Sequence, residues 1–214
     1  MSLDRGLVGP KPSDYGDEHR GEHRSESGGH RGERGREGIE AVVSLLDLEH
    51  DEKVRKIWAA LEREFGLCNI YSAPFPHFSY HGANDFDDAG VQTLLERVAR
   101  KSHPFHVRTS GLGIFPGSKP VLYVPVVRSP KLIQYHCALY GDLSDLALKP
   151  NPYYHPERWL PHMTLAHGDL TPELLPEVVR FLNEQTFNWT ITIDNFSLVY
   201  TEGVDQGLSF RVEL

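Results

Sequence analysis

Two copies of a short motif place an imidazole next to a hydroxyl in this chain. They are Pro76-His77-Phe78-Ser79-Tyr80 and Pro161-His162-Met163-Thr164-Leu165, and they lie 85 residues apart. Both follow the order proline, histidine, apolar residue, hydroxyl residue, apolar residue. Such a repeat, with a predicted helix following each copy, indicates two related units within one chain.

On a β-strand, each motif would turn its imidazole and its hydroxyl to the same face, because side chains alternate along a strand. Two such strands facing each other would surround a small volume with His77, Ser79, His162 and Thr164. Displacement at phosphorus needs a base for the attacking oxygen, an acid for the leaving oxygen and donors for the remaining oxygens. Two histidines can supply both proton roles near neutral pH without a metal. The alternative, two satisfied core or edge histidines, is disfavoured because histidine is neither a preferred strand residue nor commonly buried.

A four-histidine metal site is a second alternative, because His81 and His167 follow the two motif histidines closely. On an extended strand, His77 and His81 would lie roughly 13 Å apart, too far to share a metal through bonds of about 2 Å. We therefore expect no metal and no other cofactor. We expect His81 and His167 at the rim of the cleft or on the surface.

The elements that must position the motifs are strands and amphipathic helices. Apolar residues at helical spacing predict four helices: one behind Asp51 that ends at Gly66, one around residues 91–98, one behind Ser129-Pro130 and one behind Thr171-Pro172. Apolar and β-branched runs predict strands at residues 39–46, 105–109, 121–127, 188–193, 196–200 and 208–212. The sequence therefore indicates a mixed α and β fold.

Composition limits the classes of function. The 214 residues are 39% hydrophobic with a formal net charge of -8, which is ordinary for a globular protein and argues against binding long duplex nucleic acid on a basic surface. Cys68 and Cys137 are too far apart in sequence to suggest a disulfide framework or a cysteine metal site. The sequence shows neither a signal peptide nor a membrane-spanning apolar run, so we expect a cytoplasmic protein without a membrane partner. Separately, we expect a monomer.

Residues 1–38 differ from the rest of the chain. They contain nine glycines and fifteen charged residues. Such a segment cannot bury enough apolar surface to offset the entropy lost on ordering. We therefore expect a disordered polar tail at residues 1–38 and a folded domain at residues 39–214.

The paired motifs resemble the two His-x-[Ser/Thr]-x motifs of the 2H phosphoesterase superfamily, and in particular its 2'-5' RNA ligase-like branch. The segment Ser110-Gly111-Leu112-Gly113-Ile114-Phe115-Pro116 and the strand that follows it are similar to the segment joining the two lobes in that branch. The resemblance covers residues 39–214. It implies a bilobal α+β fold with pseudo-twofold symmetry, in which each lobe is an antiparallel sheet backed by helices and the motif strands line a central groove.

The same resemblance implies that His77 and His162 are the acid–base pair and that Ser79 and Thr164 bind phosphate oxygens. Members of the superfamily hydrolyse 2',3'-cyclic phosphates, or join or cleave 2'-5' linkages, without a metal. The resemblance therefore implies a phosphodiesterase or ligase acting on a small nucleotide or a short RNA end. A non-catalytic module that binds nucleotides or RNA ends in the same groove is the alternative. The branch often carries an arginine shortly after the second motif, where this chain has His167.

Further contacts to a nucleotide would come from aromatic and cationic side chains near the motifs, because every base has a face that can stack. Aromatic side chains in loop-like stretches are Phe115, Tyr153, Tyr154 and Trp159. Among the arginines we favour Arg158, which lies four residues before His162. We predict that Phe115, Tyr154, Arg158 and His167 contact the substrate.

Overall fold

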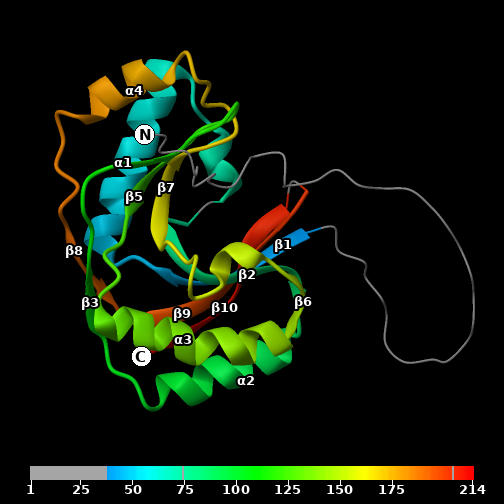
Figure 1. Ribbon diagram of the computed structural model, residues 1–214. Helices are drawn as coiled ribbons and strands as arrows, with labels where there is room; N and C mark the ends of the chain where they lie inside the picture. Colours follow the sequence, from blue (N-terminus) through cyan, green and yellow to red (C-terminus); the bar gives the residue numbers. More distant parts are fainter. Residues whose placement is uncertain (1–37, 74, 204) are drawn as a thin grey trace, which may run out of the picture.

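The computed structural model describes residues 38–73, 75–203 and 205–214, and this part of the chain is an α+β arrangement of four α-helices and antiparallel sheets (Figure 1). The helices are α1 (Leu48–Phe65), α2 (Asp88–Ala99), α3 (Pro130–Asp145) and α4 (Leu175–Leu182), with short 3-10 helices η2 (Asn69–Ser72) and η3 (Pro152–Tyr154). The strands are β1 (Gly38–Leu45), β2 (His77–Phe86), β3 (Phe105–Arg108), β4 (Gly113–Phe115), β5 (Val121–Pro125), β6 (Ala147–Pro150), β7 (His162–Ala166), β8 (Thr190–Ile193), β9 (Asn195–Glu202) and β10 (Asp205–Glu213). The predicted α and β composition is confirmed.

The prediction for the N-terminal tail lies outside the described residues, apart from Gly38, which is the first residue of β1. None of the helices in the described ranges is both long enough and apolar enough to cross a membrane.

The two motif strands belong to different sheets. The order of the larger sheet is β10-β9-β1-β2-β6, and β7 is at one edge of a second sheet with the order β4-β5-β7. Strands β3 and β8 form a separate pair. Despite belonging to different sheets, β2 and β7 lie in contact with each other.

The helices cover these sheets in two groups. Helices α2 and α3 lie together along the larger sheet, where α2 contacts β9 and β10 and α3 contacts β2 and β6 (Figure 1). Helix α1 instead contacts β7 of the smaller sheet. A single buried apolar cluster runs through the two larger sheets, the β3-β8 pair and all four helices.

The helix boundaries follow capping chemistry that the sequence predicted only in part. Gly66 ends α1 in a left-handed conformation, with φ of 71°, and Ser129 accepts a hydrogen bond at the start of α3; both are as predicted. The predicted N-cap Asp51 is wrong: α1 begins earlier, and the Asp47 carboxylate accepts the bond from His50 N. Helix α4 also begins later than predicted, because residues after Thr171 first form a turn.

Strands β2 and β7 pair with their neighbours, β1 and β5, in matching registers. In each pair the motif histidine, the apolar residue and the hydroxyl residue have successive partners, and then the register skips one residue. The skipped residues are Tyr80 in β2 and Leu165 in β7, which occupy the same motif position. Such an irregularity, typical of a β-bulge, changes the direction in which the following side chains point.

Candidate functional site

The motif side chains alternate between half-buried and buried positions, as the strand prediction requires. His77 and Ser79 are half-buried on one face of β2, and His162 and Thr164 are half-buried on one face of β7. The apolar motif residues between them are buried on the opposite face. Both strands therefore present an imidazole and a hydroxyl together.

Both imidazoles are oriented by the same local hydrogen bond. His77 Nδ1 lies 2.6 Å from the carbonyl oxygen of Phe75, and His162 Nδ1 lies 2.7 Å from that of Leu160, in each case two residues earlier. A carbonyl can only accept, so Nδ1 carries the proton in the neutral ring. The Nε2 atom of each ring is then the nitrogen that can take up or release a proton in a reaction.

The surroundings of the two rings lower both pKa values. Burial lowers the pKa of His77 below its ordinary value, and its bond to the Phe75 carbonyl opposes this shift. Burial is also the main cause of the lowered pKa of His162; the Leu160 carbonyl opposes it, and the charge on His77 lowers it further. Both rings therefore favour the neutral form more than an exposed imidazole does.

The hydroxyls of Ser79 and Thr164 have no hydrogen-bond partner within the described ranges, so both can donate to an added ligand. Their main-chain carbonyls are bound by tryptophans. Trp159 Nε1 donates to the carbonyl of Ser79 at 2.9 Å, and Trp58 Nε1 donates to that of Thr164 at 3.2 Å.

Aromatic side chains form a wall beside the second imidazole. The ring of Phe115 meets His162 edge to face at 5.1 Å, and Tyr123 lies 4.9 Å from the same imidazole. A Cβ atom at Gly113 would overlap the Tyr123 ring, so glycine at this position lets the ring lie across β4. Tyr123 was not predicted as a site residue, because its position depends on the pairing of β5 with β7, which a single sequence does not show.

The other predicted contact residues are more scattered. The Tyr154 ring stacks on His81 at 6.0 Å, four residues further along β2 than His77. The Arg158 side chain is exposed in the segment before β7. His167 is half-buried directly after β7; burial lowers its pKa and the charge of Asp169 opposes the shift. Of the four predicted contacts, Phe115 is the one for which the structure shows contact with a motif histidine.

The expected position of His81 at the cleft rim is wrong. Its side chain is fully buried, its Nε2 lies 3.0 Å from the Ser144 hydroxyl, and burial lowers its pKa to about 4. The skipped residue Tyr80 explains the difference, because the irregularity turns His81 away from the face that carries His77. Within the described ranges, no group of three or more histidine, cysteine or acidic side chains is arranged to hold a metal ion.

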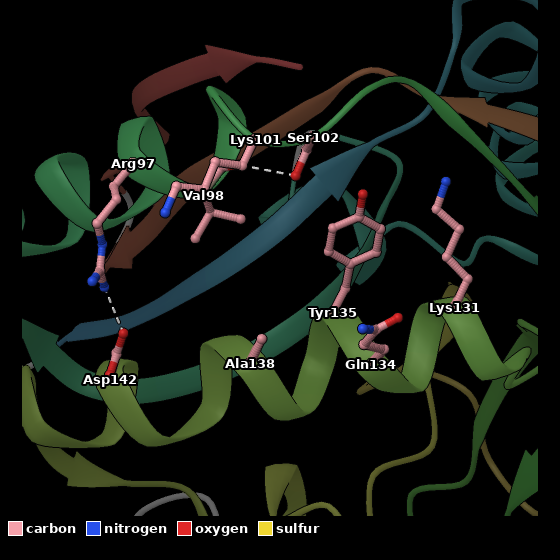
Figure 2. Close-up of a pocket in the computed structure, with 9 residues that line it drawn as sticks. All are labelled: Arg97, Val98, Lys101, Ser102, Lys131, Gln134, Tyr135, Ala138 and Asp142. Carbon is pink, nitrogen blue, oxygen red and sulfur yellow. Dashed lines mark hydrogen bonds and ion pairs between the residues drawn. The ribbon is translucent and has the colours of Figure 1, made fainter.

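A cavity of about 520 Å³ lies between α2 and α3, away from the motif residues (Figure 2). It is lined by Arg97, Val98, Lys101, Ser102, Lys131, Gln134, Tyr135, Ala138 and Asp142. Arg97 and Asp142 form an ion pair of 2.6 Å across it. None of these lining residues is a histidine, and none belongs to β2 or β7.

Two contacting strands, each with an imidazole and a hydroxyl that lacks a partner among the described residues, form a candidate two-histidine site in an α+β protein. The family comparison agrees with this class: the model of the 2'-5' RNA ligase superfamily matches residues 46–205, about three quarters of the chain. The protein belongs to this superfamily, which confirms the resemblance drawn from the motifs. It is also similar to a protein of Oceanobacillus iheyensis named "Putative phosphoesterase OB1230", with 24% identity over 134 residues that cover 61% of this chain and 74% of the relative.

Proposed function

We propose that this protein is a metal-independent phosphodiesterase that acts on a 2',3'-cyclic phosphate or on a 2'-5' linked nucleotide or RNA end. His77 and His162 are its acid–base pair. The observation that carries this proposal is the shared orientation of the two rings, each with Nδ1 held by the carbonyl two residues earlier. These bonds leave Nε2 as the reactive nitrogen of each ring. Because side chains alternate along a strand, each histidine lies on the same strand face as the hydroxyl of its motif.

The chemistry balances with these groups and water alone. In the hydrolysis of a 2',3'-cyclic phosphate, water attacks phosphorus while Nε2 of one histidine takes its proton. The bond from phosphorus to the 3' oxygen breaks, and Nε2–H of the other histidine gives its proton to that oxygen, which leaves a 2'-phosphate. Ser79 and Thr164 donate to the phosphate oxygens that do not react. Making or breaking a 2'-5' linkage uses the same pair in the corresponding proton roles.

The lowered pKa values favour the neutral base and disfavour the protonated acid in the free enzyme. A phosphate anion bound between the rings would reverse this effect, because a nearby opposite charge favours the protonated imidazole. The bound substrate would then favour protonation of the histidine that gives its proton to the leaving oxygen. A phosphate ester as the substrate is compatible with these pKa shifts.

The matching strand registers support a pseudo-twofold arrangement of two lobes around one groove. Beyond the paired residues, Leu46 N donates to the carbonyl of Pro76 at 3.3 Å, and Val126 N donates to that of Pro161 at 2.9 Å. Both prolines begin the motif, so the same main-chain bond occurs beside each histidine. We infer that the two strands present their side chains to the groove in equivalent ways.

The proposed substrate is a small nucleotide or a short RNA end, in keeping with the net charge of -8. Phe115 and Tyr123 beside His162 could stack on a base, since stacking tolerates any base. Tyr154, Arg158 and His167 remain predicted contacts, and the monomeric state remains a prediction.

The test is a panel of 2',3'-cyclic nucleotides and 2'-5' dinucleotides, assayed with the wild type and with His77→Ala and His162→Ala. Each variant should lose about a hundredfold or more in kcat while remaining folded, because each ring acts as a proton carrier. His103→Ala is the matched control, since this exposed histidine lies outside the site. Activity should survive EDTA; loss of activity that added metal restores would contradict the proposal.

A folded wild-type protein that turns over nothing in the panel would also contradict it. If that protein still binds a 2'-phosphorylated nucleotide, the non-catalytic binding module becomes the better interpretation.

A further inference from the structure

Two of the tryptophans bind the main chain of the motif strands at equivalent positions. The indole of Trp159 donates to the carbonyl of Ser79, and the indole of Trp58 donates to that of Thr164. These are the hydroxyl residues of the two motifs, directly before the residues that the strand registers skip. Each indole therefore holds the main chain where the regular ladder is interrupted.

Each of the two hydrogen bonds joins a motif strand to a segment that belongs to the other part of the structure. Trp159 lies in the segment that leads into β7, yet it binds β2. Trp58 lies on α1, and α1 directly follows β1, the neighbour of β2 in the larger sheet. The indole of Trp58 nevertheless binds β7. Strands β2 and β7 belong to different sheets, so no sheet ladder fixes their separation. The indole bonds supply two fixed connections between them.

Both indoles are held firmly in place. Trp58 and Trp159 are each 2% exposed. The Trp159 ring stacks on His136 with centroids 3.8 Å apart and an angle of 3° between the planes, and Arg128 donates to its main-chain carbonyl at 2.9 Å. A ring fixed on one side by stacking can fix the position of the carbonyl that it binds on the other side.

We propose that Trp58 and Trp159 are positioning residues that set the separation of β2 and β7, and with it the geometry of the His77 and His162 rings around the substrate. This inference rests on the proposed function, because it concerns the same pair of histidines. Neither indole needs to touch the substrate. Their effect comes through main-chain geometry, to which proton transfer and in-line displacement are sensitive at the level of about 1 Å.

The experiment compares Trp58→Phe, Trp159→Phe and Trp189→Phe in the full chain. Phenylalanine keeps an aromatic ring and removes the indole N–H. Trp189 is the matched control, because its indole donates to the Thr186 carbonyl at 2.9 Å, away from the motif strands. At a temperature well below the melting point of every variant, the first two should lose about tenfold or more in kcat with KM changed less than about threefold. The control should keep the wild-type kcat.

A second variant covers the case in which the smaller ring prevents folding. β-(3-Benzothienyl)alanine, introduced at position 159 by amber suppression, keeps the shape of the indole and replaces the N–H with sulfur. It should show the same loss of kcat as Trp159→Phe. Wild-type kcat in the folded benzothienyl variant or in both folded phenylalanine variants would overturn the proposal.

An NMR titration of the histidine rings separates failure of this inference from failure of the proposed function. Burial is the main cause of the lowered pKa of His162, and the charge on His77 adds to it. Looser motif strands should weaken both effects and raise the pKa of His162 in the Trp159 variants. Trp189→Phe should leave it unchanged. A pKa of His162 that is the same in all variants would overturn the positioning role even if no substrate is turned over, whereas an inactive wild type with the expected pKa changes would overturn the proposed function alone.

Discussion

Lowering the pH from 7 to 4.5 is expected to destabilise the protein through two histidines outside the proposed reaction. His81 and His136 are 0% and 1% exposed, and burial, the main cause in both, lowers each pKa to about 4. Within the described ranges, His81 Nδ1 and His136 Nε2 are buried without a hydrogen-bond partner. Protonation would place a charged imidazole in the core, and main-chain hydrogen bonds offset this cost only in part, so the folded state resists it.

The size of the effect follows from the difference between folded and unfolded pKa values. The unfolded chain binds protons at these rings as the pH falls through about 6.5, whereas the folded state binds them only near pH 4, so stability falls with pH inside this window. Between pH 7 and 4.5 each histidine should lower the free energy of unfolding by about 2 kcal/mol. The lowered pKa values of His77, His162 and His167 act in the same direction and add to the total.

Urea denaturation at several pH values would measure this loss in the wild type, His81→Phe, His136→Phe and the double variant. Phenylalanine cannot titrate, and at position 136 it keeps a ring on Trp159. Each single variant should reduce the loss between pH 7 and 4.5 by about 2 kcal/mol, whatever its stability at pH 7. A double variant whose stability falls with pH in parallel with the wild type would refute the reasoning.

Three further predictions concern the site and its support. The proposed reaction needs one protonated and one neutral motif ring, and both pKa values are lowered in the free protein. The pH profile of kcat/KM should therefore peak below 6.5, and a peak above pH 7 would contradict this. Gly113→Ala should lower kcat and cost about 1–3 kcal/mol in urea denaturation, because the new Cβ displaces Tyr123. Asn195→Ala should cost about 2–3 kcal/mol, because its amide binds both main-chain groups of Leu45 at 3.0 Å; an unchanged urea midpoint would show that water replaces it.

Local patterns predicted the composition of the fold and the faces of the motif strands. The alternation at His77 and Ser79, and again at His162 and Thr164, depends only on strand geometry and was confirmed. The helix ends were harder, because several residues near one end can act as caps. Asp51 lies just before the first of the regularly spaced apolar residues of α1, so it was predicted as the N-cap. The helix begins about one turn earlier, at Leu48, which is exposed and does not belong to the apolar face.

Long-range pairing accounts for what the sequence did not predict. Strand β4 has three residues, too few for a pattern of its own, and β6 has four residues of which three are exposed, so it shows no apolar alternation. The buried position of His81 depends on a skipped residue in the pairing of β1 with β2, and the place of Tyr123 beside His162 depends on the pairing of β5 with β7. Neither register can be derived from one strand alone.

The sequence repeat includes the two motif strands but not the two tryptophans that bind them. Strand geometry and hydrogen-bond chemistry explain this difference. Because side chains alternate along a strand, a hydroxyl that shares the face of each histidine must lie two residues from it, and serine and threonine occupy that position after each histidine. A carbonyl needs only one donor, and the donor can come from any element that reaches it. Trp58 on α1 and Trp159 in the segment before β7 supply the same indole N–H from unrelated places in the chain. A search for repeated sequence therefore finds the proposed acid–base residues, whereas the two indoles that bind the motif strands become apparent only from the three-dimensional contacts.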